Sequence, residues 1–131
     1  MKKLLLGLLF AGLSQQVVAE IKLGYDGLSG YSMSILDEQT KGVYDSGRYV
    51  KSVWVKNEVV ENLAASDMGQ GGYRLDNWHI DCDSRTVGIK SMTQYDSSGR
   101  MLAVNTGMLV KYRPVVPNTW IDVIVQKSCQ N

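Results

Sequence analysis

The chain has 131 residues and a mass of 14.5 kDa, which suits one domain built around one hydrophobic core. Hydrophobic residues make up 44% and charged residues 21% of the sequence, a composition that excludes disordered and collagen-like chains. Fourteen basic and thirteen acidic residues leave a formal charge of +1, so the strong positive field typical of nucleic-acid-binding proteins is missing.

Residues 1–19 have the pattern of a secretory signal peptide. Two lysines precede an apolar run from Leu4 to Leu13, and Val17-Val18-Ala19 places small or modest side chains at the cleavage positions. The run is too short for a membrane-spanning helix, which needs about 20 apolar residues. We therefore expect export to the periplasm, the medium or the cell surface, and a single mature domain over 20–131. No cysteine stands near the cleavage position to carry a lipoprotein lipid.

Alternating apolar and polar residues between turn signals predict a meander of antiparallel strands. The 37–47 region is interpreted as a turn or short hairpin with a small strand at 43–44, and 61–72 as a loop with one possible helical turn at 63–66. The expected strands are Tyr31–Leu36, Arg48–Val60, Tyr73–Cys82, Thr86–Tyr95 and Met101–Thr106.

Strand alternation also assigns side chains to faces of the sheet. In the third strand it places Trp78, Ile80 and Cys82 on one face, opposite Asn77, His79 and Asp81. In the fourth strand it places Val87, Ile89 and Tyr95 on one side, opposite Lys90 and Gln94.

A C-terminal helix is expected after two prolines, Pro114 and Pro117, which should stop any strand. Thr119-Trp120-Ile121-Asp122 has the form of a capping box and predicts a helix to about Lys127, although its β-branched residues would also suit a strand. The predicted fold is therefore α+β: a small antiparallel sheet of about five to six strands with a helix packed on one face.

The two cysteines, Cys82 and Cys129, are expected to form a disulfide, because an even count in a small exported domain favours pairing over free thiols. The bond would tether the helix to the sheet and contribute up to about 4 kcal/mol of stability. His79 is the only histidine, so it and the cysteines supply at most three metal ligands and lack a metal-binding spacing. We expect no metal and no cofactor.

An enzyme is not expected. His79 and Asp81 lie two apart and could couple, but a solvent-facing polar pair is the simpler interpretation, and no GxSxG signature is present. Gly69-Gln70-Gly71-Gly72 lacks the Lys-Ser/Thr of a phosphate-binding loop. Asp96-Ser97-Ser98-Gly99 is typical of a hairpin turn and lacks the ligand pattern of a calcium loop.

Several motifs in order resemble the surface-adhesin E family of Gram-negative bacteria. They are Val53-Trp54-Val55-Lys56, Trp78-His79-Ile80-Asp81-Cys82 with Arg85, Tyr95-Asp96-x-x-Gly99, Val116-Pro117-Asn118-Thr119 and Cys129, spanning about 29–129. The resemblance implies an antiparallel sheet whose C-terminal helix is held by a Cys82–Cys129 bond. It also implies virulence-related adhesion to host matrix or serum proteins such as laminin and vitronectin.

The expected function is therefore a non-enzymatic exported binding protein, adhesin-like, whose partner is a protein rather than nucleic acid. Cations with nearby tyrosines are the candidate contact residues: Arg74, His79, Arg85, Lys90, Arg100, Lys111 and Arg113. The alternative is a periplasmic inhibitor or accessory protein, for example one that blocks a lysozyme.

Overall fold

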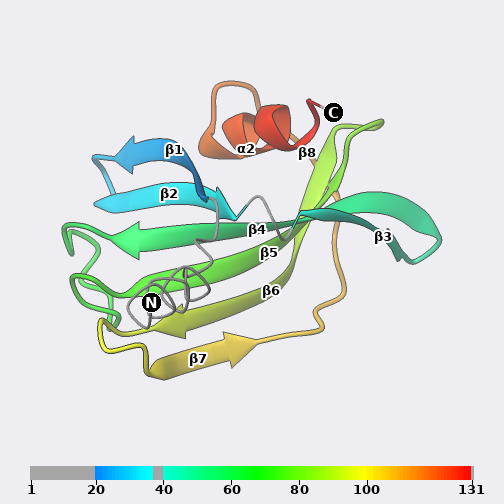
Figure 1. Cartoon of the computed structure of the whole chain (residues 1–131). Coiled ribbons are helices and arrows are strands. Elements are labelled where there is room, and N and C mark those ends of the chain that lie inside the picture. The colour runs from blue at the N-terminus through cyan, green and yellow to red at the C-terminus, as the bar shows by residue number, and fades with distance from the viewer. Residues whose placement is uncertain (1–19, 37–39, 131) are drawn as a thin grey trace, which may run out of the picture.

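The computed structural model describes residues 20–36 and 40–130, so the expected signal peptide and part of the expected 37–47 turn lie outside the described residues. Within them the chain forms an eight-stranded sheet and one helix, which confirms the α+β class (Figure 1). The strand number exceeds the expected five to six. The strands are β1 (Glu20–Asp26), β2 (Tyr31–Leu36), β3 (Lys41–Asp45), β4 (Arg48–Val59), β5 (Tyr73–Asp81), β6 (Thr86–Tyr95), β7 (Met101–Asn105) and β8 (Arg113–Pro114).

Every strand pair is antiparallel, and the main path through the sheet is β1-β2-β4-β5-β6-β7. The twelve-residue strand β4 is long enough to pair with two neighbours on one side, β2 along its second half and β3 along its first. The β3–β4 hairpin consequently projects from one end of the sheet (Figure 1). The short strand β8 pairs with the beginning of β6.

The helix α2 (Trp120–Ser128) begins where the capping box predicts, since the Thr119 side chain accepts a hydrogen bond from the Asp122 backbone N–H. It packs on one face of the sheet, which we call the helix-side face and which carries Val53 and Ile80. The opposite, far face carries Ser52 and His79. The buried core comprises Ile35, Val53, Val55, Ile80 and Val87 from the sheet and Ile124 and Val125 from the helix.

The disulfide joins Cys82, just beyond β5, to Cys129, the C-cap of α2, with a Cα–Cα distance of 5.7 Å. Both cysteines pack against the buried core. The predicted tether between helix and sheet is therefore confirmed, together with the predicted position of Cys82 on the helix-side face.

Two strands were not expected from the sequence. β1 follows the predicted cleavage position, and its register shifts between Lys22 and Gly24. A Cβ at Gly24 would lie 2.8 Å from the Trp120 ring, so glycine lets the start of the helix pack on this edge. β8 contains Pro114, although prolines were expected to stop any strand; it lies at a sheet edge, where a missing N–H costs little.

A β-bulge changes the predicted faces of β6. Trp78 pairs with Ile89 but Asn77 pairs with Ser91, so one extra residue of β6 lies between these pairs. The alternation is reversed beyond the bulge, and Tyr95 lies on the far face, where its ring stacks on Tyr73 at 4.8 Å. The prediction that Tyr95 shares a face with Val87 and Ile89 is wrong for this reason.

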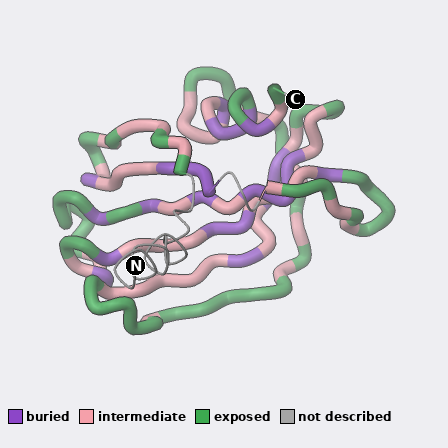
Figure 2. The backbone as a smooth tube through the Cα atoms, viewed as in Figure 1, coloured by how far each residue is buried: buried purple, intermediate pink, exposed green. Residues whose placement is uncertain are grey.

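The 60–72 connection is a loop of turns, as predicted, without the possible helical turn at 63–66. Met68 is buried, and the Gly71 N–H donates to the Val59 carbonyl, so the loop is fastened to the end of β4. Figure 2 shows that buried stretches gather in the central strands and α2, whereas β7 and the segment after it are largely exposed.

Candidate functional site

A groove of about 380 Å³ lies on the helix-side face, between β6 and the chain that leads into α2. Trp78, Val87 and Ile89 contribute apolar surface from the sheet, and Val116 and Ile121 contribute it from the opposite side. We call this hollow the Trp78 groove. An open apolar groove with a few polar groups at its margin is the usual form of a binding site.

Two cations, Lys111 and Arg113, line the same groove. Arg113 pairs with Val87 in the sheet, which places its side chain on the helix-side face. Both residues are exposed, and neither forms an ion pair with another described residue. The groove therefore offers positive charge beside apolar surface without an internal counter-ion from residues 20–36 or 40–130.

Arg85, at the turn between β5 and β6, holds the wall of the groove in place. Its guanidinium lies 3.0 Å from a carboxylate oxygen of Asp122 in α2, and its carbonyl accepts from the Val115 N–H. The second Asp122 oxygen accepts from the Asn118 N–H at 3.0 Å. These contacts tie the 115–118 wall to both the sheet and the helix, so Arg85 acts mainly as a structural residue.

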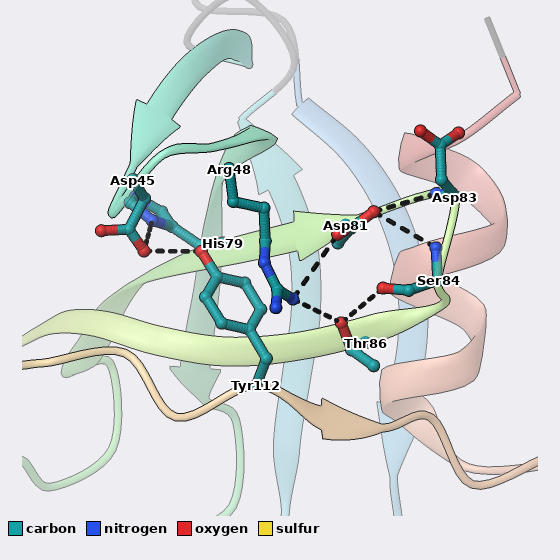
Figure 3. A network of polar contacts seen from close by, with 8 residues as sticks. All are labelled: Asp45, Arg48, His79, Asp81, Asp83, Ser84, Thr86 and Tyr112. Atoms are coloured by element: carbon teal, nitrogen blue, oxygen red, sulfur yellow. Dashed lines mark hydrogen bonds and ion pairs between the residues drawn. The ribbon is translucent and has the colours of Figure 1, made fainter.

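The far face carries a polar network centred on Asp45, at the end of β3 (Figure 3). One Asp45 oxygen lies 3.2 Å from His79 Nδ1 and accepts a 2.6 Å hydrogen bond from the Tyr112 hydroxyl. His79 is only 6% exposed. His79 therefore contacts Asp45 and not Asp81, the partner that the sequence left possible, and the preferred interpretation of His79 as solvent-facing is wrong.

Arg48 extends this network toward the turn after β5 (Figure 3). Its guanidinium carbon lies 4.4 Å from the centre of the Tyr112 ring, and its Nη1 lies 3.5 Å from Asp81 and 3.4 Å from the Thr86 hydroxyl. The other Asp81 oxygen accepts from the backbone N–H groups of residues 83 and 84. Asp81 thus closes the β5–β6 turn instead of assisting His79.

The hydrogen bond with Tyr112 is the main reason that the pKa of Asp45 is lowered, and His79 adds to it. Burial and the same bond raise the pKa of Tyr112, so its hydroxyl stays protonated as the donor. Hydrogen bonds from the 83–84 turn lower the pKa of Asp81. Both carboxylates are therefore ionised acceptors at neutral pH, which suits anchoring of the chain.

Gly88 allows the segment before β8 to cross the far face closely enough for Tyr112 to reach Asp45. A Cβ at Gly88 would lie 2.5 Å from Val110 Cγ1 and 2.7 Å from the Lys111 carbonyl oxygen. Because Gly88 pairs with His79, this crossing covers the histidine's neighbourhood. Alternation along 111–113 then directs Tyr112 to the far face and Arg113 to the Trp78 groove.

The structure brings only Lys111 and Arg113 together at one groove, with Arg85 behind its wall. Lys90 lies on β6 and acts electrostatically on Asp45 of the far face. Arg74 is engaged by the buried Asp76 at 2.8 Å. Arg100 lies in the β6–β7 hairpin and pairs with Asp96. The seven predicted contact residues therefore do not form a single surface.

Sequence reasoning missed Asp45 and the role of Trp78 in the groove. Asp45 lies 34 residues before His79, and only the pairing of β3 with β4 brings the two together. Tyr112 lies two residues before Pro114, and no local sequence pattern indicates the carboxylate that it contacts.

Together these features define a small disulfide-linked α+β domain with one cationic apolar groove. Comparison of the chain with family models, curated proteins and solved structures finds no significant match. Among the described residues, no three potential metal-binding side chains cluster, and no helix has the length and apolar character needed to cross a membrane. The resemblance to the surface-adhesin E family therefore rests on the sequence motifs alone.

Proposed function

We propose that this chain is an exported, non-enzymatic binding protein, adhesin-like in function, whose protein partner docks in the Trp78 groove. The observation that supports this proposal is the groove itself, with its exposed apolar surface beside Lys111 and Arg113. Apolar contacts would supply the docking energy, and the two cations would select an acidic segment of the partner.

The far-face network supports a non-catalytic role. His79 is buried, and no serine or cysteine within residues 20–36 and 40–130 donates to its ring. Its neighbours Asp45 and Tyr112 hold the segment that carries the two cations of the groove. This supports a structural role for His79, Asp45 and Tyr112, which is to anchor that segment to the sheet. Partners of the class that the motif resemblance implies, laminin and vitronectin, are the first proteins to test.

Biolayer interferometry with immobilised laminin and vitronectin tests the proposal on the purified, disulfide-bonded protein. Saturable binding is expected to at least one of them, and Arg113→Glu is expected to weaken it about tenfold by reversing a charge at the groove. Val116→Asp places a carboxylate on the exposed apolar wall and is expected to have a similar effect.

Arg100→Glu is the matched control, because Arg100 is also an exposed arginine but lies in the β6–β7 hairpin. It should leave binding within about twofold. Absence of saturable binding to both proteins contradicts the proposed function. Equal weakening by Arg100→Glu and Arg113→Glu contradicts the assignment of the groove as its site.

A further inference from the structure

The turn between β1 and β2 projects a leucine into solvent. Leu28 is 93% exposed, more than any other large hydrophobic side chain of the described residues. The turn itself is well held: the Asp26 carboxylate accepts hydrogen bonds from the Leu28 N–H at 3.0 Å and from the Ser29 hydroxyl at 2.8 Å, and the Gly30 N–H donates to the Asp26 carbonyl. Leu28 is therefore presented on a pre-organised turn, which lowers the entropic cost of binding.

A second exposed leucine lies beside this turn, in the loop after β4, at the same end of the sheet (Figure 1). The Gly30 carbonyl accepts from the N–H groups of Val60 and Glu61 at 3.0 and 3.1 Å, which joins the two segments. A Cβ at Gly30 would lie 3.2 Å from Leu63 Cγ, so the two segments approach closely while Leu63 stays 55% exposed. We call Leu28, Leu63 and their two segments the leucine tip.

The leucine tip is acidic. Asp26 lies in the turn, Glu61 in the adjoining loop, and Glu58 near the end of β4. None of these three carboxylates forms an ion pair with a described residue. Residues 26–30 and 58–63 contain no lysine or arginine. The tip therefore combines exposed apolar side chains with uncompensated negative charge.

The leucine tip and the Trp78 groove are chemically complementary. The groove offers about 380 Å³ between apolar walls, with Lys111 and Arg113 at its margin and no counter-ion for either among the described residues. The tip supplies an apolar side chain and the opposite charge. Within one copy the two surfaces do not meet, because Leu28 is almost fully exposed and does not line the groove. The matching site for the tip is therefore on another copy of the chain.

We propose that copies of this chain associate head to tail, with the leucine tip of one copy bound in the Trp78 groove of the next. Leu28 enters the apolar part of the groove, and Asp26 and Glu61 face Lys111 and Arg113. Because tip and groove are different surfaces, each added copy leaves one of each free, so the assembly can grow. This inference rests on the proposed function in that both assign protein docking to this groove. A docked copy occupies the place of the partner and so limits partner binding at high protein concentration.

Sedimentation velocity of the purified, disulfide-bonded protein, from micromolar to millimolar concentration, tests this association. The mean mass of the wild type is expected to rise beyond that of a dimer only at the upper concentrations, because one turn in one groove is a small contact. Leu28→Ser is expected to weaken the association about tenfold, because it removes the apolar side chain that enters the groove. Leu109→Ser is the matched control: Leu109 is also an exposed leucine but lies after β7, and its loss should change the association less than about twofold.

A mixture of two double variants tests the head-to-tail arrangement itself. The tip variant Leu28→Ser/Leu63→Ser keeps an intact groove, and the groove variant Lys111→Glu/Arg113→Glu keeps an intact tip. Each variant alone is expected to stay monomeric. Their equimolar mixture should form dimers and nothing larger, because only one intact tip and one intact groove can meet. Dimer formation in the mixture also shows that both variants are folded.

Four results would contradict this inference: a wild type that stays monomeric at millimolar concentration, an equal loss of association in Leu109→Ser, a mixture of the two double variants that stays monomeric, or either double variant that associates alone as the wild type does. Failure of the proposed function is recognised separately. The tip variant should bind laminin or vitronectin as well as the wild type does, because its groove is unchanged. Absence of that binding in every form of the protein contradicts the proposed function and leaves the sedimentation result to decide on self-association.

Discussion

The Tyr112 hydroxyl donates a hydrogen bond to Asp45 at 2.6 Å. The same carboxylate oxygen contacts His79, so a segment distant in sequence is bound to two strands through one acceptor. Hydrogen bonds to charged groups contribute more than those between neutral groups, typically about 1.5–3 kcal/mol. A substitution that removes only the Tyr112 hydroxyl therefore tests directly how much this hydrogen bond contributes to stability.

Tyr112→Phe is expected to lower the free energy of unfolding by about 1.5 kcal/mol, because Asp45 loses a charge-assisted hydrogen bond while the ring keeps its packing. Urea unfolding at neutral pH measures the change. Tyr95→Phe is the matched control, since it also removes a phenolic hydroxyl but keeps the stack on Tyr73, and it should cost less than about 0.5 kcal/mol. Equal losses in the two variants would contradict the anchoring role.

The pH dependence of this difference has a definite sign. The pKa of Asp45 is lowered from its ordinary value of 3.8, chiefly by Tyr112, so the ionised carboxylate stabilises the folded protein above pH 3.8. This contribution is lost as the pH falls through the lower, folded pKa. The gap in unfolding free energy between wild type and Tyr112→Phe should therefore shrink between about pH 5 and pH 2. A gap that stays constant or widens on acidification would show that Asp45 is not the group involved.

At the residue scale, the sequence predicts on which face of the sheet a side chain lies better than it predicts which residue that side chain contacts. Alternation correctly places His79 and Asp81 on the same face of β5, because the extra residue of the bulge lies in β6 and leaves β5 regular. It does not reveal that His79 contacts Asp45, a residue on a strand two places away in the sheet. Alternation also places Tyr95 on the wrong face, because no sequence pattern indicates the bulge between Ile89 and Ser91 of β6.

Among the elements, α2 shows how a local signal can decide between helix and strand. Its β-branched residues suit either structure, but the Thr119 side chain satisfies the Asp122 N–H and fixes the start of the helix. β1 and β8 give weaker signals, because Gly24 interrupts the first and Pro114 occupies half of the second. The helix cap can therefore be predicted from the sequence, whereas the pairing of the short edge strands depends on the rest of the folded sheet.

Thr119→Ala is expected to lower the free energy of unfolding by about 1 kcal/mol, the usual cost of losing an N-cap side chain. The Thr119 hydroxyl also donates to the Val116 carbonyl at 2.7 Å, so the groove wall should loosen with the helix end. Urea unfolding measures the loss, and hydrogen exchange of residues 115–123 locates it. Thr106→Ala, in an exposed connection after β7, should leave both measurements unchanged.

Across the whole molecule, stability depends on how firmly one nine-residue helix is held against the sheet. The helix buries Ile124 and Val125 completely or nearly so, and each such side chain contributes about 1.5–3 kcal/mol. The Cys82–Cys129 bond adds a covalent tether at the helix end. The disulfide could be predicted because the sequence contains only two cysteines, 47 positions apart.

Cys82→Ala/Cys129→Ala is expected to lower the unfolding free energy by up to about 4 kcal/mol, mainly because the unfolded chain regains freedom. Thermal unfolding should show a fall in Tm of about 10 °C or more. Wild-type protein under reducing conditions should behave like the double variant. A double variant as stable as the oxidised wild type would contradict the tethering role.

The alternation of residues 111–113 has a consequence for mutational scans. Lys111 and Arg113 line the Trp78 groove, while Tyr112 between them is fastened to Asp45 on the opposite side of the sheet. A selection for variants that no longer capture a partner would therefore recover Tyr112 and Asp45 alongside the two cations. Unless the folding of each variant is also measured, residues on both faces of the sheet would be wrongly assigned to one binding site.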